Sequence, residues 1–247
     1  MFSNVVFLEK RPRLRKPVLI EGLPGIGFVA NIVALHLISE LKAKKLCQIH
    51  SPSFQAFSLT SRGGDIRHPI NELYYCLTES TDRDLLILFG NSQASDPRGQ
   101  YDLCKRILDV SQSLGSEFVL TIGGLRRDLV PSEPRVFCAA SDKETLDTAK
   151  GLGADVMRGQ IYGVAGLLIG LARLRKMRGL CVLSETSGLI ADVAAARSAL
   201  KFTSKLLGLS VDYSRLDQAV ENNKRLLDSF AQWRPQERPR FRYPGPV

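Results

Sequence analysis

The sequence predicts an α/β protein, a three-layer sandwich around a central sheet that is mixed but mostly parallel. Short apolar runs alternate with helical patterns along the chain, which is typical of a sheet covered by helices. The run "RDLLILFG" (83–90) is almost continuously apolar and ends in glycine, as expected for a central strand buried on both faces. Residues 46–78 have a hairpin-like pattern, so we expect them to add antiparallel strands and make the sheet mixed.

The elements follow in order along the chain. Strands are expected at 4–9, 17–22, 46–51, 54–60, 71–78, 83–90, 117–124, 135–140 and 179–188. Helices are expected at 25–41, from 97 to about 114, from 141 onward, and at 164–179, 189–208 and 211–233. Asp96 before Pro97 marks a helix start, because a carboxylate caps free amides and proline suits the first helical position. Ser141 and Glu144 have the spacing of a capping box.

The domain organisation follows from the absence of any linker pattern within 17–230. Residues 1–230 are expected to form a single α/β domain. Residues 231–247 are expected to be a basic, proline-rich flexible tail, because the end of the chain has no hydrophobic periodicity.

The net charge of +9 comes mostly from two short segments. Residues 10–16 carry five positive charges, and residues 234–242 carry four positive charges and one negative charge. Because the rest of the chain is nearly neutral, these segments indicate solvated connections rather than a nucleic-acid-binding face. The longest apolar runs, 26–38 and 161–174, are shorter than the roughly 20 residues that span a bilayer. No secretory signal is visible, so a cytoplasmic protein is expected.

The cysteines and histidines do not predict a metal or redox site. Five cysteines are widely spaced, and we expect them to be small buried side chains in a reducing compartment. The histidines are isolated from one another in the sequence, and His36 within an apolar helix indicates a core or interface residue. No metal ion and no cofactor is therefore expected.

The glycine-rich stretch "GLPGIG" (22–27) lies between a strand and a helix. It offers Gly22, Gly25 and Gly27 as candidates for binding an anion, because a helix N-terminus attracts negative charge. A dinucleotide site would also need an acidic residue after the next strand, and a phosphate loop would need a lysine. Neither is present, so a tight strand-to-helix turn is the preferred interpretation.

A second polar candidate is the stretch "GGLRRD" (123–128), which places Arg126, Arg127 and Asp128 at a strand end where α/β proteins often bind ligands. Ser92 in "GNSQA" resembles a loose nucleophile elbow. A hydrolase of that type needs a histidine after the serine, but all three histidines precede Ser92. We therefore expect no catalytic residues.

Several segments together resemble a known family. "PVLIEGLPGIGFVANIVALHLI", "DLLILFGNSQ", "LTIGGL", "GQIYGVAGLLIGLAR" and the long block containing "LSETSG" followed by Asp192 are similar to archaeal homologues of the proteasome assembly chaperones. This is the family of the second eukaryotic assembly-chaperone subunit, and some members are labelled ATP-grasp-like. The resemblance implies a nucleoside-phosphorylase-like fold without active-site residues. It also implies a homo-oligomer that binds proteasome α subunits or related proteins.

The C-terminal tail departs from what this resemblance implies. Chaperones that grip the α-ring are expected to end in a hydrophobic residue, tyrosine and one further residue. Here the sequence ends in 245–247, "GPV", and Arg242 precedes Tyr243. Phe241 and Tyr243 remain candidates for partner binding. The sequence thus predicts a non-enzymatic, chaperone-like protein; the alternative is an enzyme of phosphorylase-like fold that binds a nucleotide or phosphate ligand.

Overall fold

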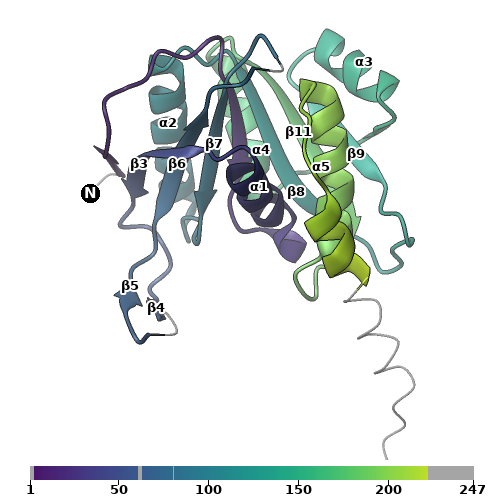
Figure 1. Cartoon of the computed structure of the whole chain (residues 1–247), viewed down its shortest axis with the longest axis horizontal. Coiled ribbons are helices and arrows are strands. Elements are labelled where there is room, and N and C mark those ends of the chain that lie inside the picture. The colour runs from purple at the N-terminus through teal and green to yellow at the C-terminus, as the bar shows by residue number, and fades with distance from the viewer. Residues whose placement is uncertain (1–2, 61–62, 80, 222–247) are drawn as a thin grey trace, which may run out of the picture.

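The computed structural model describes residues 3–60, 63–79 and 81–221 (Figure 1). These residues form a nine-stranded sheet with the strand order β1-β3-β6-β7-β2-β8-β11-β9-β10. Its strands are β1 (Asn4–Phe7), β2 (Val18–Gly22), β3 (Lys44–His50), β6 (Asn71–Cys76), β7 (Leu85–Gly90), β8 (Phe118–Arg126), β9 (Val136–Ala140), β10 (Asp155–Val156) and β11 (Arg178–Thr186). A small hairpin of β4 (Leu59–Thr60) and β5 (Ile66–Arg67) projects from the body beside the large sheet (Figure 1).

The sheet is mixed, as predicted, but it is not mostly parallel. The central strands β7, β2, β8 and β11 are parallel to one another. Among the described residues, four of the eight neighbouring pairs are antiparallel. The reason is connectivity: β3, β6 and β7 follow one another without crossover helices, and β8 reaches β9 through a loop, so neighbouring strands reverse direction.

Helices cover both faces of the sheet and complete the predicted three layers (Figure 1). They are the short 3-10 helix η1 (Ile26–Phe28), α1 (Val29–Glu40), α2 (Pro97–Ser113), α3 (Lys143–Gly151), α4 (Gly163–Leu174) and α5 (Val193–Leu207). α1, α3 and α5 pack on one face, around Ile20, Val33 and Leu200. α2 and α4 pack on the other, around Leu19 and Leu103.

Most of the expected elements are confirmed, with local corrections. Asp96 caps α2 by accepting a hydrogen bond from the Gly99 amide at 2.8 Å. The cap of α3 is Asp142 and not Ser141, because the Asp142 carboxylate reaches the Thr145 amide at 2.9 Å. Of the strand expected at 54–60, the two residues of β4 pair with β5 and Phe54 makes an isolated bridge to Ala94; β10 was not predicted.

The last expected helix begins within the described residues. Positions 214–221 are helical, and Asp212 accepts a hydrogen bond from the Ser214 amide at 2.9 Å. His36 is 8% exposed, and its Nε2 lies 2.7 Å from the carbonyl oxygen of Asp212. His36 is therefore a buried, satisfied histidine, as predicted. The remainder of the expected helix and the tail at 231–247 lie outside the described residues.

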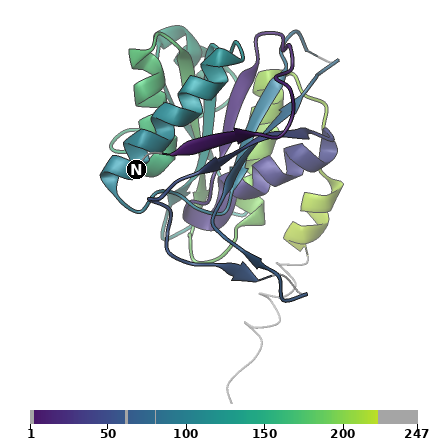
Figure 2. The same cartoon turned by 90° about the vertical axis from the view of Figure 1, so that its left-hand side faces the viewer.

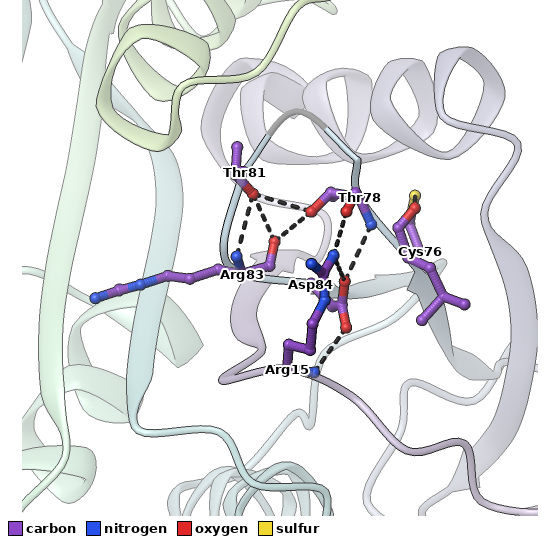
Figure 3. Close-up of polar contacts among 7 residues, drawn as sticks. Arg15, Cys76, Thr78, Thr81, Arg83 and Asp84 are labelled. Atoms are coloured by element: carbon purple, nitrogen blue, oxygen red, sulfur yellow. Dashed lines mark hydrogen bonds and ion pairs between the residues drawn. The ribbon is translucent and has the colours of Figure 1, made fainter.

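The basic segment 10–16 is anchored at one end by a buried carboxylate. Asp84 is 1% exposed. It accepts hydrogen bonds from the Arg15 amide at 2.6 Å, the Thr78 amide at 3.0 Å and the Arg15 guanidinium at 3.0 Å (Figure 3). Burial alone would raise the pKa of Asp84, but these hydrogen bonds lower it below its usual value. The segment is a connection, as predicted, yet it is fixed by Asp84 rather than fully solvated.

Replacing Asp84 with alanine is expected to lower the free energy of unfolding by about 2 kcal/mol, because two amides lose their acceptor. The pKa is lowered in the folded state, so the contribution is complete above the usual carboxyl pKa and is lost as the pH falls through the folded value. Urea unfolding at pH 7 and pH 3 should therefore show a gap between wild type and Asp84→Ala that narrows at pH 3. An equal gap at both pH values would contradict this charge-dependent role.

Candidate functional site

The carboxyl ends of the parallel strands meet at one edge of the sheet, which we call the carboxyl edge. The glycine loop 22–28 leaves β2 at this edge, and α1, α2, α4 and α5 all begin there. Ligands of open α/β sheets usually bind at such an edge, where neighbouring strands send their helices to opposite faces. Here that position lies between β2, followed by α1, and β7, followed by α2.

Side-chain amides span the carboxyl ends of the neighbouring strands β2 and β7. Nδ2 of Asn31 donates to the carbonyl oxygens of Gly22 at 3.1 Å and Gly90 at 2.8 Å. Nε2 of Gln93 donates to the carbonyl oxygen of Pro24 at 2.6 Å, and its Oε1 accepts from the Val164 amide at 3.2 Å. Asn31 thus joins the ends of β2 and β7, and Gln93 joins the glycine loop to the start of α4.

The glycine loop also contacts the block 183–192, the other most specific part of the family resemblance. The Asp192 amide donates to the carbonyl oxygen of Gly27 at 2.8 Å. Thr186 donates from Oγ1 to Oδ2 of Asp192 at 2.7 Å, and Oδ1 of Asp192 caps α5 through the Ala195 amide. A Cβ on Gly27 would lie 2.7 Å from Oγ1 of Thr186. Two motifs about 160 residues apart therefore form one structure.

The predicted anion-site residues lie in two separate segments that make different contacts. Gly22, Gly25 and Gly27 lie in the glycine loop. Arg126, Arg127 and Asp128 are exposed around the end of β8, but the Arg127 guanidinium lies 3.5 Å from Glu185 and over the Phe137 ring. The Arg127 side chain is thus engaged by Glu185 and Phe137, and anion binding by the six residues stays a prediction.

Glu185 is the centre of this second cluster. Its carboxylate is 1% exposed and makes two hydrogen bonds with the Arg135 guanidinium, at 2.8 and 3.1 Å. These hydrogen bonds, more than the charge of Arg127, lower the pKa of Glu185. The carboxylate is therefore ionised and paired at neutral pH, as in a structural ion-pair network.

Glu21 is a buried acid that the sequence interpretation missed. It is 1% exposed at the end of β2 and accepts a hydrogen bond from the Leu23 amide at 2.9 Å. Burial raises its pKa to about 8, so the carboxyl is mostly protonated at neutral pH. The available signal was the sequence "PVLIEG", where an acidic residue closes an apolar strand. Such a position is more often exposed, and only the packing of β2 between β7 and β8 shows that it is not.

An exposed apolar cluster covers the junction of the two motifs. We call it the apolar edge patch; its members are Ile26, Phe28, Leu189 and Ile190, with exposed fractions of 47, 49, 78 and 61%. The two segments touch, because a Cβ on Gly188 would lie 2.8 Å from Cγ2 of Ile26. Exposed clusters of large apolar residues mark interaction surfaces. The sequence shows each residue but not that the two segments meet.

Phe28 has an unusual backbone conformation within this patch. Its φ of 52° and ψ of 21° are left-handed, a region that costs a residue with a Cβ about 1 kcal/mol or more. An aromatic residue held there, half exposed and outside the core, is a local strain that the fold maintains. Phe28 is the residue directly before α1, and its side chain is half exposed at the carboxyl edge.

Other predicted features give no alternative site. Ser92 is 2% exposed, and its Oγ donates to the neighbouring carbonyl oxygen of Gln93. The five cysteines are buried and unbridged. In the described parts of the chain, no three His, Cys, Asp or Glu residues cluster as metal ligands. No helix there has the length and apolar character to cross a membrane. Phe241 and Tyr243 lie outside the described residues.

Comparisons with known proteins agree with the resemblance. MJ1210, an uncharacterized protein of Methanocaldococcus jannaschii, is 30% identical over 221 residues, which cover 88% of this chain and 84% of that protein. The crystal structure of Pyrococcus furiosus PbaB, an archaeal proteasome activator, is 34% identical with a TM-score of 0.87, covering 94% of this chain and 99% of that one.

Pyrococcus furiosus PbaA, an archaeal homolog of proteasome-assembly chaperone, shares the fold at 23% identity, with a TM-score of 0.78 and coverage of 94% and 92%. The family model of the PAC2 family matches residues 19–231. The resemblance is confirmed at this level, while its second-subunit, ATP-grasp-like and phosphorylase-like details stay predictions. The chain belongs to the PAC2 family.

Proposed function

We propose that this protein is a non-enzymatic, chaperone-like scaffold that self-associates and binds proteasome α subunits or related proteins through its carboxyl edge. The observation that carries the proposal is the apolar edge patch. It lies where the glycine loop and the block 183–192 meet, so the most specific sequence motifs of the chain build an exposed apolar surface.

The interior of the same edge favours a protein partner over a small ligand. Asn31 joins the ends of β2 and β7, and Gln93 joins the glycine loop to the start of α4, at the position where a small ligand of an α/β fold would bind. Outside it, four large apolar side chains face solvent. Burial of each large apolar side chain in a partner contributes about 1.5–3 kcal/mol.

The relatives support the class of partner. PbaB, at 34% identity, is an archaeal proteasome activator, and proteasome subunits are therefore the first partners to test. The proposal includes the second-subunit type of the assembly-chaperone family and a cytoplasmic location. It also includes the absence of catalysis. Phe241 and Tyr243 in the tail are proposed as a second contact.

Phe28→Asn is the sharpest test of the apolar edge patch. Asparagine tolerates the left-handed region, so the variant should keep the melting temperature of the wild type or raise it. Loss of the aromatic ring should weaken binding to proteasome α subunits of the same organism by tenfold or more. Calorimetric titration with full-length protein measures the affinity, and a thermal melt measures the stability.

Leu77→Asn is the matched control. Leu77 is 60% exposed but follows β6 at the opposite end of the sheet, so its replacement should leave the affinity unchanged. Equal affinities for wild type and Phe28→Asn would show that the patch is not the docking surface. A chain truncated after residue 233 separates the tail from the patch, since only loss of the tail contact would change its affinity.

A further inference from the structure

Helices α2 and α4 lie on the face of the sheet opposite α1 and α5 (Figures 1 and 2). An exposed groove runs along these two helices. The two helices both begin at the carboxyl edge and pack side by side. The groove has a volume of about 1210 Å³. It is separate from the apolar edge patch and shares no residue with it.

The groove presents both protruding and recessed apolar surface. Tyr101, Tyr162 and Leu174 line it with exposed fractions of 57, 82 and 81%. Between its ends, the α4 residues Gly166 and Gly170 lower its floor. A surface that carries projections and a recess can be complementary to a second copy of itself.

Gly170 is not explained by packing within the chain. A Cβ on Gly166 would lie 2.2 Å from the carbonyl oxygen of Ile161, which accounts for that glycine. A Cβ on Gly170 would meet nothing within 4 Å. Glycine inside a helix costs roughly 1 kcal/mol relative to alanine. Close approach of another backbone is a physical reason for glycine at such a position.

The two ends of the groove carry opposite charges. Asp96 lies at the end where α2 and α4 begin, and Arg173 lies in the last turn of α4. A hydrogen bond from the Gly99 amide, with others, lowers the pKa of Asp96, so its carboxylate is ionised at neutral pH. Asp96 and Arg173 are therefore oppositely charged side chains at the two ends of the groove.

We propose that the α2–α4 groove is the surface through which two copies of this chain associate, with their α4 helices antiparallel across a two-fold axis. In this arrangement Arg173 of each copy meets Asp96 of the other, and Leu174 of each copy lies over the Tyr162 end of the other. The helices cross between Gly166 and Gly170, where the missing side chains allow close contact. The inference rests on the self-association in the proposed function and names its surface.

Gly170→Arg tests this surface without a cost to the protomer, because the position is open and arginine is a better helix former than glycine. The variant should keep the wild-type circular dichroism spectrum and melt no earlier at low protein concentration. Its mass by light scattering should fall at least twofold below that of the wild-type assembly. Gly151→Arg is the matched control: a Cβ there also meets nothing within 4 Å, but α3 lies on the other face, so the wild-type mass should remain.

A crosslinking experiment gives a positive signal for the same contact. The native cysteines are buried, so Gly170→Cys adds an exposed thiol near the proposed two-fold axis. A short bismaleimide should link this variant into dimers within minutes, and Gly151→Cys should stay unlinked.

Three results would overturn the proposed surface: a monomeric wild type, a Gly170→Arg variant with the wild-type mass, or equal crosslinking of both cysteine variants. Binding of α subunits by the apolar edge patch is measured separately through Phe28→Asn. A monomeric wild type would also refute the self-association in the proposed function, whereas the other two results would refute the groove alone.

Discussion

Replacing Glu21 with glutamine is expected to stabilise the protein at pH 8 and to remove most of its stability loss between pH 5 and pH 8. Burial raises the pKa of the Glu21 carboxyl from 4.5 to about 8. Between these values the folded protein holds a proton that the unfolded chain has released, so stability falls as the pH rises. Each pKa unit corresponds to about 1.4 kcal/mol, which makes the full effect on the order of 4 kcal/mol.

Glutamine has nearly the shape of the protonated acid and keeps an acceptor for the Leu23 amide, so the variant lacks this pH dependence. Urea unfolding at pH 5, 6.5 and 8 measures the difference. Glu185→Gln is the matched control, because that carboxyl is equally buried but its pKa is lowered by Arg135. The control should be less stable than wild type at neutral pH. Parallel pH profiles for wild type and Glu21→Gln would refute a neutral Glu21.

Gly22→Ala is expected to destabilise the fold by about 3 kcal/mol, through overpacking. The added Cβ would lie 2.1 Å from Cβ of Ala34, 3.0 Å from the carbonyl oxygen of Ala30 and 3.1 Å from that of Leu88. None of these atoms is the far end of a flexible side chain. Either α1 moves away from the sheet or the loop loses its amide bridges, so the melting temperature should drop by several degrees.

Gly25→Ala is the control within the same loop. A Cβ there meets nothing within 4 Å, and the φ of −152° is extended backbone that any residue adopts. The melting temperature of Gly25→Ala should therefore equal that of wild type. Similar losses in both variants would mean that the whole loop is sensitive, rather than the contact of Gly22 with α1.

The fold was predictable where local chemistry and burial agree. The Asp96-Pro97 pair marks the start of α2, and "RDLLILFG" marks a strand buried on both faces. The mixture of strand directions was less predictable, because β9 pairs beside β11 through a loop that carries no direction signal. Two-residue strands such as β10 form only beside a neighbouring strand, so their own sequence does not predict them. The choice of Asp142 over Ser141 as the cap of α3 depends on local geometry alone.

The candidate site was predictable only in part. Gly22 and Gly27 stand out in the sequence, and the structure explains them by contacts with Ala34 and Thr186. These two positions are therefore glycine because of close packing, and not because they bind a phosphate. The apolar edge patch could not be predicted, because it depends on the contact between Ile26 and Gly188, and no local sequence pattern indicates that contact. That Glu21 is buried and protonated could not be predicted without the positions of the neighbouring strands, because the same acid at an exposed strand end would be ionised.

The two edge strands of the sheet are short, which limits aggregation by strand addition. β1 has four residues and β10 has two, and they form the two ends of the strand order. Long, flat edge strands recruit further strands and lead to fibrils, whereas short ones offer few unpaired backbone groups. This chain therefore has little capacity for open-ended sheet extension, and its complexes are expected to be finite particles held together by helices and loops.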